Sequence, residues 1–534
     1  MTHAIEPPGP GEARPRSRLW SLPAAIFLLA GLATTADFGV TWDEPESWAA
    51  GLANLEIVKR TLQGRTDLEW PWHELTGYQF VFDTLRAGFG RAAERVLRLR
   101  EPLAGFHLFN LLLSTAAVLL TSRIAFRVSG SLRVALLAGA ALITTPKLLA
   151  HSQNNPKDVI ALFLAPWTIG LLLEACASAR ARRFLAPGLA YGLALANHVA
   201  SCFLFPLAGA WILWHGPGRL RDRFRALLVL LSGAGVAFLL SWPWLWPDPW
   251  DRLRQAARHV AGFTVEMPVL YLGAVYPHAD PPAHYSVVSL GISLPLFHLA
   301  AFAAGLVPGR NASPGARRLR ALAVLWSGML LLGLDLTTAR YDGARHLLPI
   351  LPALALLAGL GLDRLLGALR VRHRGAGAGT WAARGGLVLL LAAYAGVGSQ
   401  IARVHPYEDA YVNEAARMLL PEPREEHVEL EYWGTTYKEG ARWLRANAAP
   451  GSTVLVPLGY HVARLYLDDA FRVVDGDRRD EDDRPQHLMF LTRPTFYTPR
   501  IRELERERSP VFTIRRQGAT LLRIYRLDAP RRGG

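Results

Sequence analysis

The feature that most constrains the fold is a series of long apolar runs, which fill most of the chain up to about residue 402. A bilayer core of roughly 30 Å is crossed by about 20 helical residues. With 51% hydrophobic and only 19% charged residues, the chain is too apolar for an ordinary soluble protein. We therefore predict an all-α polytopic membrane protein with about eleven transmembrane helices. The segments lie near 19–36, 103–122, 134–150, 158–176, 184–201, 203–216, 226–243, 287–307, 320–337, 346–363 and 385–402. For the short fifth and sixth segments, one re-entrant unit is the alternative.

Arginine clusters in the short connections predict how these helices are oriented. Alternate connections, near 14–18, 123–133, 180–183, 219–225, 310–320 and 364–384, each hold at least three Arg. The opposite short connections, 151–157 and 337–345, hold only Lys157, Arg340 and Arg345. Because cytoplasmic loops carry an excess of Lys and Arg, we expect a multi-pass protein of the inner (plasma) membrane with a cytoplasmic N-terminus and an extracytoplasmic C-terminus.

This orientation predicts the domain organisation. A disordered cytoplasmic tail is expected at 1–18, and a transmembrane catalytic region at 19–402 with outer loops at 37–102 and 243–286. A soluble extracytoplasmic α/β domain is expected at 403–534, where "TVLVPL", "FRVVDG", "HLMFLTR" and "VFTIRRQGATLLRIYRL" are typical of strands and "YKEGARWLRANA" of a helix. A cleaved signal peptide is the alternative for the first run, and it also leaves Asp43 outside.

The net charge of +15 does not indicate a nucleic-acid partner, because the Arg residues lie between apolar runs rather than along one basic face. The two cysteines, Cys176 and Cys202, lie inside apolar runs. We therefore expect no disulfide framework, and both side chains to serve in packing.

Two acidic motifs are predicted at the outer membrane face. Asp43 and Glu44 follow the first apolar run, and Pro45 suits the first turn of a new helix, so capping of that helix is the structural alternative. The second motif, "AHSQNNPKD", places Lys157 and Asp158 in the outer turn between the third and fourth segments. A solvated polar turn is the alternative there, but two acidic motifs on one face favour a shared site.

A basic motif, "TTARYDGARHLLP", lies on the same predicted face. Arg340, Tyr341, Arg345 and His346 stand in a short outer loop where few positive charges are expected. Paired Arg residues at headgroup level predict an anionic ligand such as a lipid phosphate. An internal ion pair with Asp342 is the alternative.

Two further candidates border this region. His198 lies near the outer end of the fifth segment, where an ionisable group faces a cavity or an interhelical hydrogen bond. Tyr285 precedes the eighth segment among other aromatic and His residues, which an interfacial aromatic belt also explains. We take both as candidate substrate contacts.

Carboxylates beside guanidinium groups suit group transfer from a lipid-linked donor. One carboxylate accepts the proton of an attacking hydroxyl, while Arg stabilises the departing phosphate. Such chemistry proceeds outside the cytoplasm without nucleotide. Asp43 and Asp158 are also hard oxygen donors, so a divalent metal is a candidate ligand, although no cofactor is required by the sequence.

The acidic pair, the "NNPKD" turn and the "YDGARHLLPILP" segment resemble the polyprenyl-phosphate-dependent glycosyltransferases of GT-C fold. That superfamily includes dolichyl-phosphate-mannose protein mannosyltransferases and bacterial lipid A aminoarabinose transferases. The tail stretch "HPYEDAYVNEAA", followed by "LEYWGTTYKEGARWLRANAAPGSTV", also resembles the outer domain of uncharacterised bacterial members. The resemblance covers roughly 19–460, and only the acidic pair with the topology is specific.

The resemblance implies roles for the candidate residues. Asp43 is the implied base or metal-anchoring carboxylate, Glu44 supports it, and Asp158 is the second acidic motif. Arg340 and Arg345 would hold the carrier phosphate. Many relatives carry a Lys near the position of His198, where this chain has a side chain whose charge depends on pH.

The sequence thus predicts transfer of a sugar, with inversion, from a polyprenyl-phosphate carrier to an extracytoplasmic hydroxyl on a lipid, glycan or protein. A lipid-linked sugar flippase is one alternative, although transporters place ionisable groups near mid-membrane rather than at one face. An oligosaccharide ligase using a diphosphate-linked donor is the other.

Overall fold

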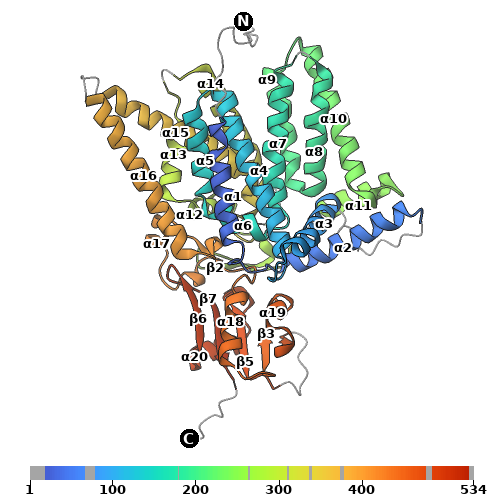
Figure 1. The fold of residues 1–534 in the computed structure, drawn as a ribbon, viewed down its shortest axis with the longest axis vertical. Coiled ribbons are helices and arrows are strands. Elements are labelled where there is room, and N and C mark those ends of the chain that lie inside the picture. Colours follow the sequence, from blue (N-terminus) through green and yellow to red (C-terminus); the bar gives the residue numbers. More distant parts are fainter. Residues whose placement is uncertain are drawn as a thin grey trace.

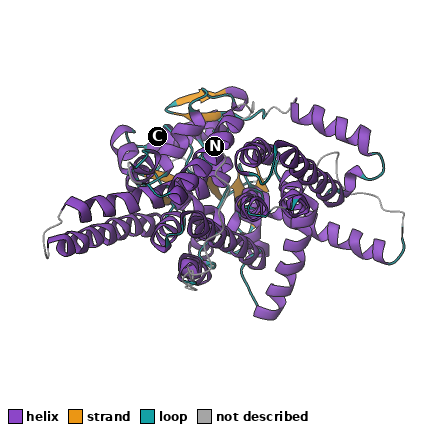
Figure 2. Ribbon diagram, turned by 90° about the horizontal axis from the view of Figure 1, so that it is seen from above, coloured by secondary structure: helices purple, strands orange, loops and turns teal. Residues whose placement is uncertain are grey.

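The computed structural model describes residues 18–65, 79–178, 180–261, 265–309, 312–335, 340–372, 378–476 and 484–527. Apolar helices form a bundle at one end of the molecule, and a small sheet with its own helices lies at the other (Figure 1). Seen from above, several bundle helices are viewed nearly end-on around the centre (Figure 2). The predicted tail at 1–18, apart from Arg18, lies outside the described residues, as do 66–78 of the predicted first outer loop.

The described residues of all eleven predicted apolar segments lie mainly on helices, and 336–337 of the ninth segment lie outside the described residues. The helices are α1 Leu22–Thr34, α4 Ala104–Ser129, α5 Leu132–Ile143, α6 Pro146–Asn154, α7 Asp158–Cys176, α8 Leu185–Asn197, α9 Leu204–His215, α10 Leu220–Ser241, α12 Tyr285–Ser293, α13 Leu296–Leu306, α14 Pro314–Asp335, α15 Leu351–Arg372 and α16 Ala378–Val404. Five are long and apolar enough to cross a membrane, and up to seven spans result if each of two bent pairs counts as one. The chain is therefore a helical membrane protein, and the figure of about eleven spans stays a prediction.

Two predicted continuous segments are broken helices. α5 and α6 are bent by 67° at Thr144 and Thr145, just before Pro146. α12 and α13 are bent by 118° before Pro295. Proline disfavours the helical conformation of the residue before it, which accounts for both breaks. As a result α6 carries polar side chains that are buried rather than solvated.

Small residues let the bundle helices approach closely. A Cβ added at Gly188 would lie 2.3 Å from the carbonyl oxygen of Leu230, and one at Gly192 would lie 2.2 Å from that of Ala234. The two glycines, four positions apart, therefore form the face of α8 that packs on α10. Membrane helices gain their association from such close packing, because lipid is as apolar as their side chains.

Three amphipathic or mixed helices lie near the end of the bundle closest to the sheet: α2 Asp43–Leu62, α3 Phe80–Leu97 and α11 Pro249–Ala261 (Figure 1). A short hairpin of β1 Val269–Tyr271 and β2 Ala274–Tyr276 is bridged to the C-terminal region between Tyr271 and Val428. α2 begins at Asp43, as the position of Pro45 predicts, and three acidic residues fill its first turn.

The C-terminal region, 405–527, contains a five-stranded mixed sheet in the order β4-β3-β5-β7-β6. Its strands are β3 Thr453–Val456, β4 Arg472–Asp475, β5 His487–Leu491, β6 Phe512–Arg516 and β7 Ala519–Arg526, and its helices are α17 Glu414–Leu419, α18 Tyr437–Asn447, α19 Tyr460–Leu467 and α20 Pro499–Glu507. β3 pairs in parallel with β4 and β5, and β7 runs antiparallel to β5 and β6. The predicted strands and helix are confirmed, whereas the domain boundaries stay a prediction.

The core of this region includes a segment from the other end of the sequence. Val40 is wholly buried in it, and Trp42 packs against it. The backbone N–H of Trp42 donates to the carbonyl oxygen of Trp433 at 3.0 Å. The C-terminal region therefore holds the chain immediately before Asp43, where the candidate site begins.

Candidate active site

Asp43 lies between two cations at the first residue of α2. One carboxylate oxygen is 3.6 Å from Nζ of Lys157, and the other is 3.3 Å from Nη1 of Arg345. The Asp43 side chain keeps 15% exposure, so a small group can reach it. The N-terminus of α2 favours a negative charge at this position. Residues from the first, second and third sequence motifs thus meet at one carboxylate.

Glu44, the neighbour of Asp43, points into the protein. Its side chain is wholly buried, and Oε2 accepts hydrogen bonds from the backbone N–H of Thr41 at 2.6 Å and its hydroxyl at 3.2 Å. Oε1 lies 2.9 Å from Nε2 of His107 on α4. This geometry differs from the capping alternative: within the described residues no side-chain hydrogen bond caps α2, and Glu44 instead secures the turn that leads into the helix.

Asp158 occupies the first turn of α7 and is almost fully buried. Oδ1 lies 3.1 Å from Nε2 of His198 and 3.6 Å from Nδ1 of His346. Oδ2 accepts from the amide of Asn155 at 2.9 Å, and Asn155 Oδ1 accepts the backbone N–H of Asp158 at 2.9 Å. The "NNPKD" turn is therefore a structured cap that fixes the carboxylate toward two histidines.

Arg345 lies between two carboxylates and contacts both Asp43 and Asp342. In addition to Asp43, its guanidinium contacts Asp342 at 3.2 Å and Nε2 of His346 at 3.4 Å. It lies over the rings of Tyr341 and Trp433, at 5.4 and 4.9 Å from the centroids. The ion pair with Asp342, which the sequence leaves as an alternative, is present, and it coexists with the contact to Asp43.

The remaining candidates are placed less directly. Nη2 of Arg340 forms an ion pair with Asp280 at 2.8 Å. The hydroxyl of Tyr285 accepts the backbone N–H of Gly343 at 2.8 Å and so supports the loop that carries Arg345. Tyr341 packs edge-on against His346, with centroids 4.9 Å apart. Tyr285 and Tyr341 therefore support the loop that carries the basic motif. Of the two arginines in this loop, Arg345 is the one that contacts Asp43.

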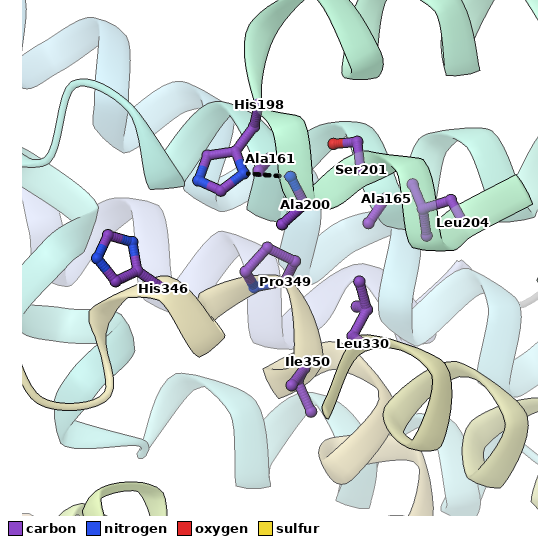
Figure 3. Close-up of a pocket in the computed structure, with 10 residues that line it drawn as sticks. All are labelled: Ala161, Ala165, His198, Ala200, Ser201, Leu204, Leu330, His346, Pro349 and Ile350. Atoms are coloured by element: carbon purple, nitrogen blue, oxygen red, sulfur yellow. Dashed lines mark hydrogen bonds between the residues drawn. The ribbon is translucent and has the colours of Figure 1, made fainter. Parts of the chain in front are cut away.

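His198 and His346 also face a small pocket that continues into the bundle. Figure 3 shows both rings at one end, with Leu330, Pro349 and Ile350 toward the other. Most of its lining is aliphatic or alanine. The cavity measures about 10 Å³, room for a single water-sized group, so a ligand reaches this border between polar and apolar side chains only if the surrounding side chains move.

Asp158, His198 and His346 bring one ligand atom each within 4.8 Å of one another, the type of grouping that binds a metal ion. The hydrogen bond at the second nitrogen of His198 argues against metal binding. Its Nδ1 accepts the backbone N–H of Ala200 at 3.2 Å (Figure 3), so Nε2 carries the proton and donates it to Asp158. A metal-bound histidine instead donates from its second nitrogen. The geometry thus favours a carboxylate–histidine pair over a metal site.

A second polar cluster lies beside the site and involves His151 of the second motif. Its Nε2 is 3.3 Å from Asp409, which also pairs with Lys147. Although burial acts to raise it, the charges of Lys147 and His151 hold the pKa of Asp409 below its usual range. The His151 ring packs edge-on against Trp433 at 5.1 Å. This cluster joins α6 to the C-terminal region.

Sequence reasoning missed the contributions of the C-terminal region to this site. Trp433 covers Arg345, and Arg493 pairs with Asp342 at 2.9 Å. Burial raises the pKa of Glu429 to about 7, although Arg493 lies 3.3 Å away and acts in the opposite direction. The stretch "LEYWGTT" around Trp433 is part of the family resemblance, whereas no sequence signal distinguishes Arg493.

No protein-family model matches the chain, and no curated protein matches it in sequence. Among solved structures, ArnT from Cupriavidus metallidurans in the apo state is similar at a TM-score of 0.50 and 13% identity, covering 94% of this chain and 97% of ArnT. The arabinofuranosyltransferase AftD from Mycobacteria gives a TM-score of 0.46 at 16% identity, covering 89% of this chain and 35% of AftD. The oligosaccharyltransferase AglB from Archaeoglobus fulgidus gives 0.44 at 12% identity, covering 89% of this chain and 70% of AglB.

We base the fold assignment on ArnT, whose length this chain matches almost completely. The similarity covers the helical bundle and the C-terminal region together, as the sequence resemblance predicts for the greater part of the chain. The chain therefore has the GT-C fold.

Proposed function

We propose that this protein transfers one sugar from a polyprenyl-monophosphate carrier to an extracytoplasmic hydroxyl, with inversion at the anomeric carbon. The observation that carries the proposal is the partly exposed carboxylate of Asp43 between Lys157 and Arg345. A base and two phosphate-binding cations are the groups that a displacement of a phosphate leaving group needs. The GT-C fold and the resemblance to polyprenyl-phosphate-dependent enzymes support this chemistry.

In this mechanism Asp43 accepts the proton of the attacking hydroxyl. The hydroxyl oxygen forms a bond to the anomeric carbon while the bond from that carbon to the phosphate oxygen breaks. The electron pair leaves with the polyprenyl phosphate, whose charge Lys157 and Arg345 stabilise. Lys157 is the more accessible cation, at 36% exposure against 8% for Arg345. One displacement at the anomeric carbon inverts its configuration.

Asp158 and the two histidines serve the donor in this proposal. Asp158 orients the N–H of His198, and both histidine rings line the pocket that continues into the apolar bundle. The two imidazoles are polar groups at the border of the apolar bundle, where the sugar or phosphate of the donor would lie, and the apolar side chains beyond them match the start of the polyprenyl chain once they move apart. Glu44 supports the turn before Asp43, and Arg340 remains a candidate phosphate contact.

The same proposal places Asp43, the outer loops and the C-terminal region outside the cytoplasm. Several of the predicted cytoplasmic connections meet at one end of the bundle: Arg18 lines one pocket with Arg123 and Arg127, and Arg133 at the start of α5 pairs with Asp363 of α15. A shared basic end supports the positive-inside orientation.

A reconstitution experiment tests the activity. The purified protein is placed in vesicles with a panel of polyprenyl-phosphate sugars and a hydroxyl acceptor, and mass spectrometry follows free polyprenyl phosphate and glycosylated acceptor. We expect both products to form in equal amounts from one donor of the panel. Movement of intact lipid-linked sugar without bond cleavage would instead identify a flippase. Turnover confined to diphosphate-linked oligosaccharides would identify a ligase.

A further inference from the structure

Arg493 is a fully buried cation of the C-terminal region that lies close to the site. It follows β5, and its side chain has no exposed surface. Nη2 is 2.9 Å from Asp342, and Nε is 3.3 Å from Glu429. The guanidinium also lies over the ring of Trp42, at 5.4 Å from the ring centroid. Trp42 is the residue immediately before Asp43. A guanidinium desolvated to this degree is costly unless its partners are fixed.

A continuous chain of ion pairs runs from Arg493 to Asp43. Oδ1 of Asp342 faces Arg493, while Oδ2 faces Nη2 of Arg345 at 3.2 Å. Nη1 of Arg345 then contacts Asp43 at 3.3 Å. Asp342 thus gives one oxygen to each guanidinium, and Arg345 divides its two terminal nitrogens between two carboxylates.

This division depends on Arg493. A carboxylate with both oxygens available binds one guanidinium in the bidentate manner, which is the stronger arrangement. Without Arg493, both oxygens of Asp342 are available to Arg345, and the contact to Asp43 competes with a bidentate pair. The backbone of Asp342 is held in a left-handed turn, at φ 54°, and the next residue is bound by Tyr285. The arginine side chain of position 345 is therefore the part that moves.

The C-terminal region also holds the backbone on the other side of Asp43. Nζ of Lys438 donates to the carbonyl oxygens of Ala36 and Phe38 at 2.6 and 3.2 Å. The backbone N–H of Val40 donates to the hydroxyl of Tyr466 at 2.8 Å. The C-terminal region thus contacts both the backbone before Asp43 and, through Asp342, the side chain of Arg345.

We propose that Arg493 is a positioning residue of the active site, through which the C-terminal region sets the place of Arg345 beside Asp43. This rests on the proposed function in one respect, namely that Asp43 and Arg345 act in the transfer. The structural part of the proposal, the dependence of the Arg345–Asp43 contact on Arg493, stands without it.

The test compares Arg493→Met with Arg523→Met. Arg523 is a matched control because it also forms ion pairs in the C-terminal region, with Glu425 and Glu505 at 3.2 Å each, and has no part in the chain to Asp43. Structures of both variants in lipid are determined by cryo-electron microscopy. We expect Arg345 to pair in the bidentate manner with Asp342 and to lose its contact with Asp43 only in the Arg493 variant. An unchanged Arg345–Asp43 contact in that variant overturns the proposal, whether or not the protein transfers sugar.

Kinetics supplies the second readout. A misplacement of about 1 Å at a reacting group costs up to about 100-fold in rate, so we expect kcat per folded protein to fall by about 10- to 100-fold in Arg493→Met and to stay at the wild-type value in Arg523→Met. In Arg493→Met/Asp342→Asn the competing carboxylate is gone, and we expect kcat to recover in part. Equal kcat in all three variants, at equal melting temperature, also overturns the positioning role. If wild type transfers no sugar while Arg345 still leaves Asp43 in the variant, the proposed function fails and the structural proposal holds.

Discussion

The buried guanidinium of Arg86 offers a quantitative test of how the site is held together. Its side chain is fully buried on α3, 3.0 Å from Asp83 and 3.1 Å from Oδ1 of Asn110. It also donates to the carbonyl oxygen of Pro156, in the turn that carries Lys157 and Asp158. Replacing Arg86 by Met therefore removes an ion pair and the anchor of the second acidic motif.

The contacts of Arg86 set the size of the effect. Breaking a buried ion pair on one side costs about 3–5 kcal/mol, because the other charge is left without compensation. The Arg86→Met and Asp83→Asn variants each fall in this class. In the double variant only the two acceptors on Asn110 and Pro156 stay unpaired, at about 1–3 kcal/mol each. The two single costs together exceed the cost of the double variant by about 4 kcal/mol, which is the expected coupling free energy of the double-mutant cycle.

The pH dependence of the Arg86→Met variant has a defined sign. Burial raises the pKa of Asp83 to about 6, and the charge of Arg86 acts against that rise. Removing Arg86 therefore favours the protonated carboxyl further, and protonation removes the uncompensated charge. We expect the loss of stability to become smaller as the pH falls.

Equilibrium unfolding in mixed detergent and dodecyl sulfate micelles, followed by tryptophan fluorescence, measures the cycle. The 16 tryptophans of the chain provide the signal. Additive costs, with a coupling free energy near zero, would show that Arg86 and Asp83 do not act as a buried pair and would refute the reasoning.

Two further predictions concern the junction between α16 and the C-terminal region, at His405, and the packing of the helical bundle. Hydrogen bonds to Glu408, and then to Asp37, raise the pKa of His405 to about 9, so the stability that His405 adds should be fully present below about pH 6.5 and be lost as the pH rises through 9. Melting curves of His405→Gln against wild type across this range check it, and a difference that grows with pH contradicts it. In Gly192→Ala the added methyl meets a carbonyl oxygen of α10, and we expect a loss of about 1–3 kcal/mol, whereas Gly235→Ala meets nothing within 4 Å. Equal melting temperatures of the two alanine variants would contradict the close packing of α8 and α10.

The sequence predicts which residues share a face better than which residues touch. Hydropathy and the Arg distribution place Asp43, Asp158 and Arg345 at one end of the bundle, because a helix that spans a membrane leaves its connections at the two surfaces. The same patterns do not indicate which of Arg340 and Arg345, five positions apart in one loop, contacts Asp43. That choice depends on the turn at Asp342, where a positive φ directs the chain.

Neighbouring carboxylates show a similar limit. Asp43 and Glu44 are adjacent on α2, so they point about 100° apart around the helix axis, and one faces the site while the other is buried. The sequence is equally compatible with Asp43 facing the site and with Glu44 facing it. The buried side is decided by His107 on α4, a contact between segments about sixty residues apart that local periodicity does not encode.

The contribution of the C-terminal region was the part least open to sequence reasoning. Its strands lie where the sequence predicts them, and this prediction is confirmed. Arg493, however, lies 151 positions from Asp342 and follows a strand in a chain rich in arginine. Only the folded arrangement, in which Val40 and Trp42 pack into the core of that region, shows that it reaches the site.

The most direct test of the account is the rate at which polyprenyl phosphate is released from a polyprenyl-phosphate sugar in a single turnover. Wild type is compared with Asp43→Asn and with Glu46→Gln, a matched control because Glu46 is exposed in the same first turn of α2. A general base contributes about 10²- to 10⁴-fold, so we expect Asp43→Asn to be slower by at least about 100-fold and Glu46→Gln to match wild type. Release by Asp43→Asn at the wild-type rate would contradict the central claim that Asp43 is the base.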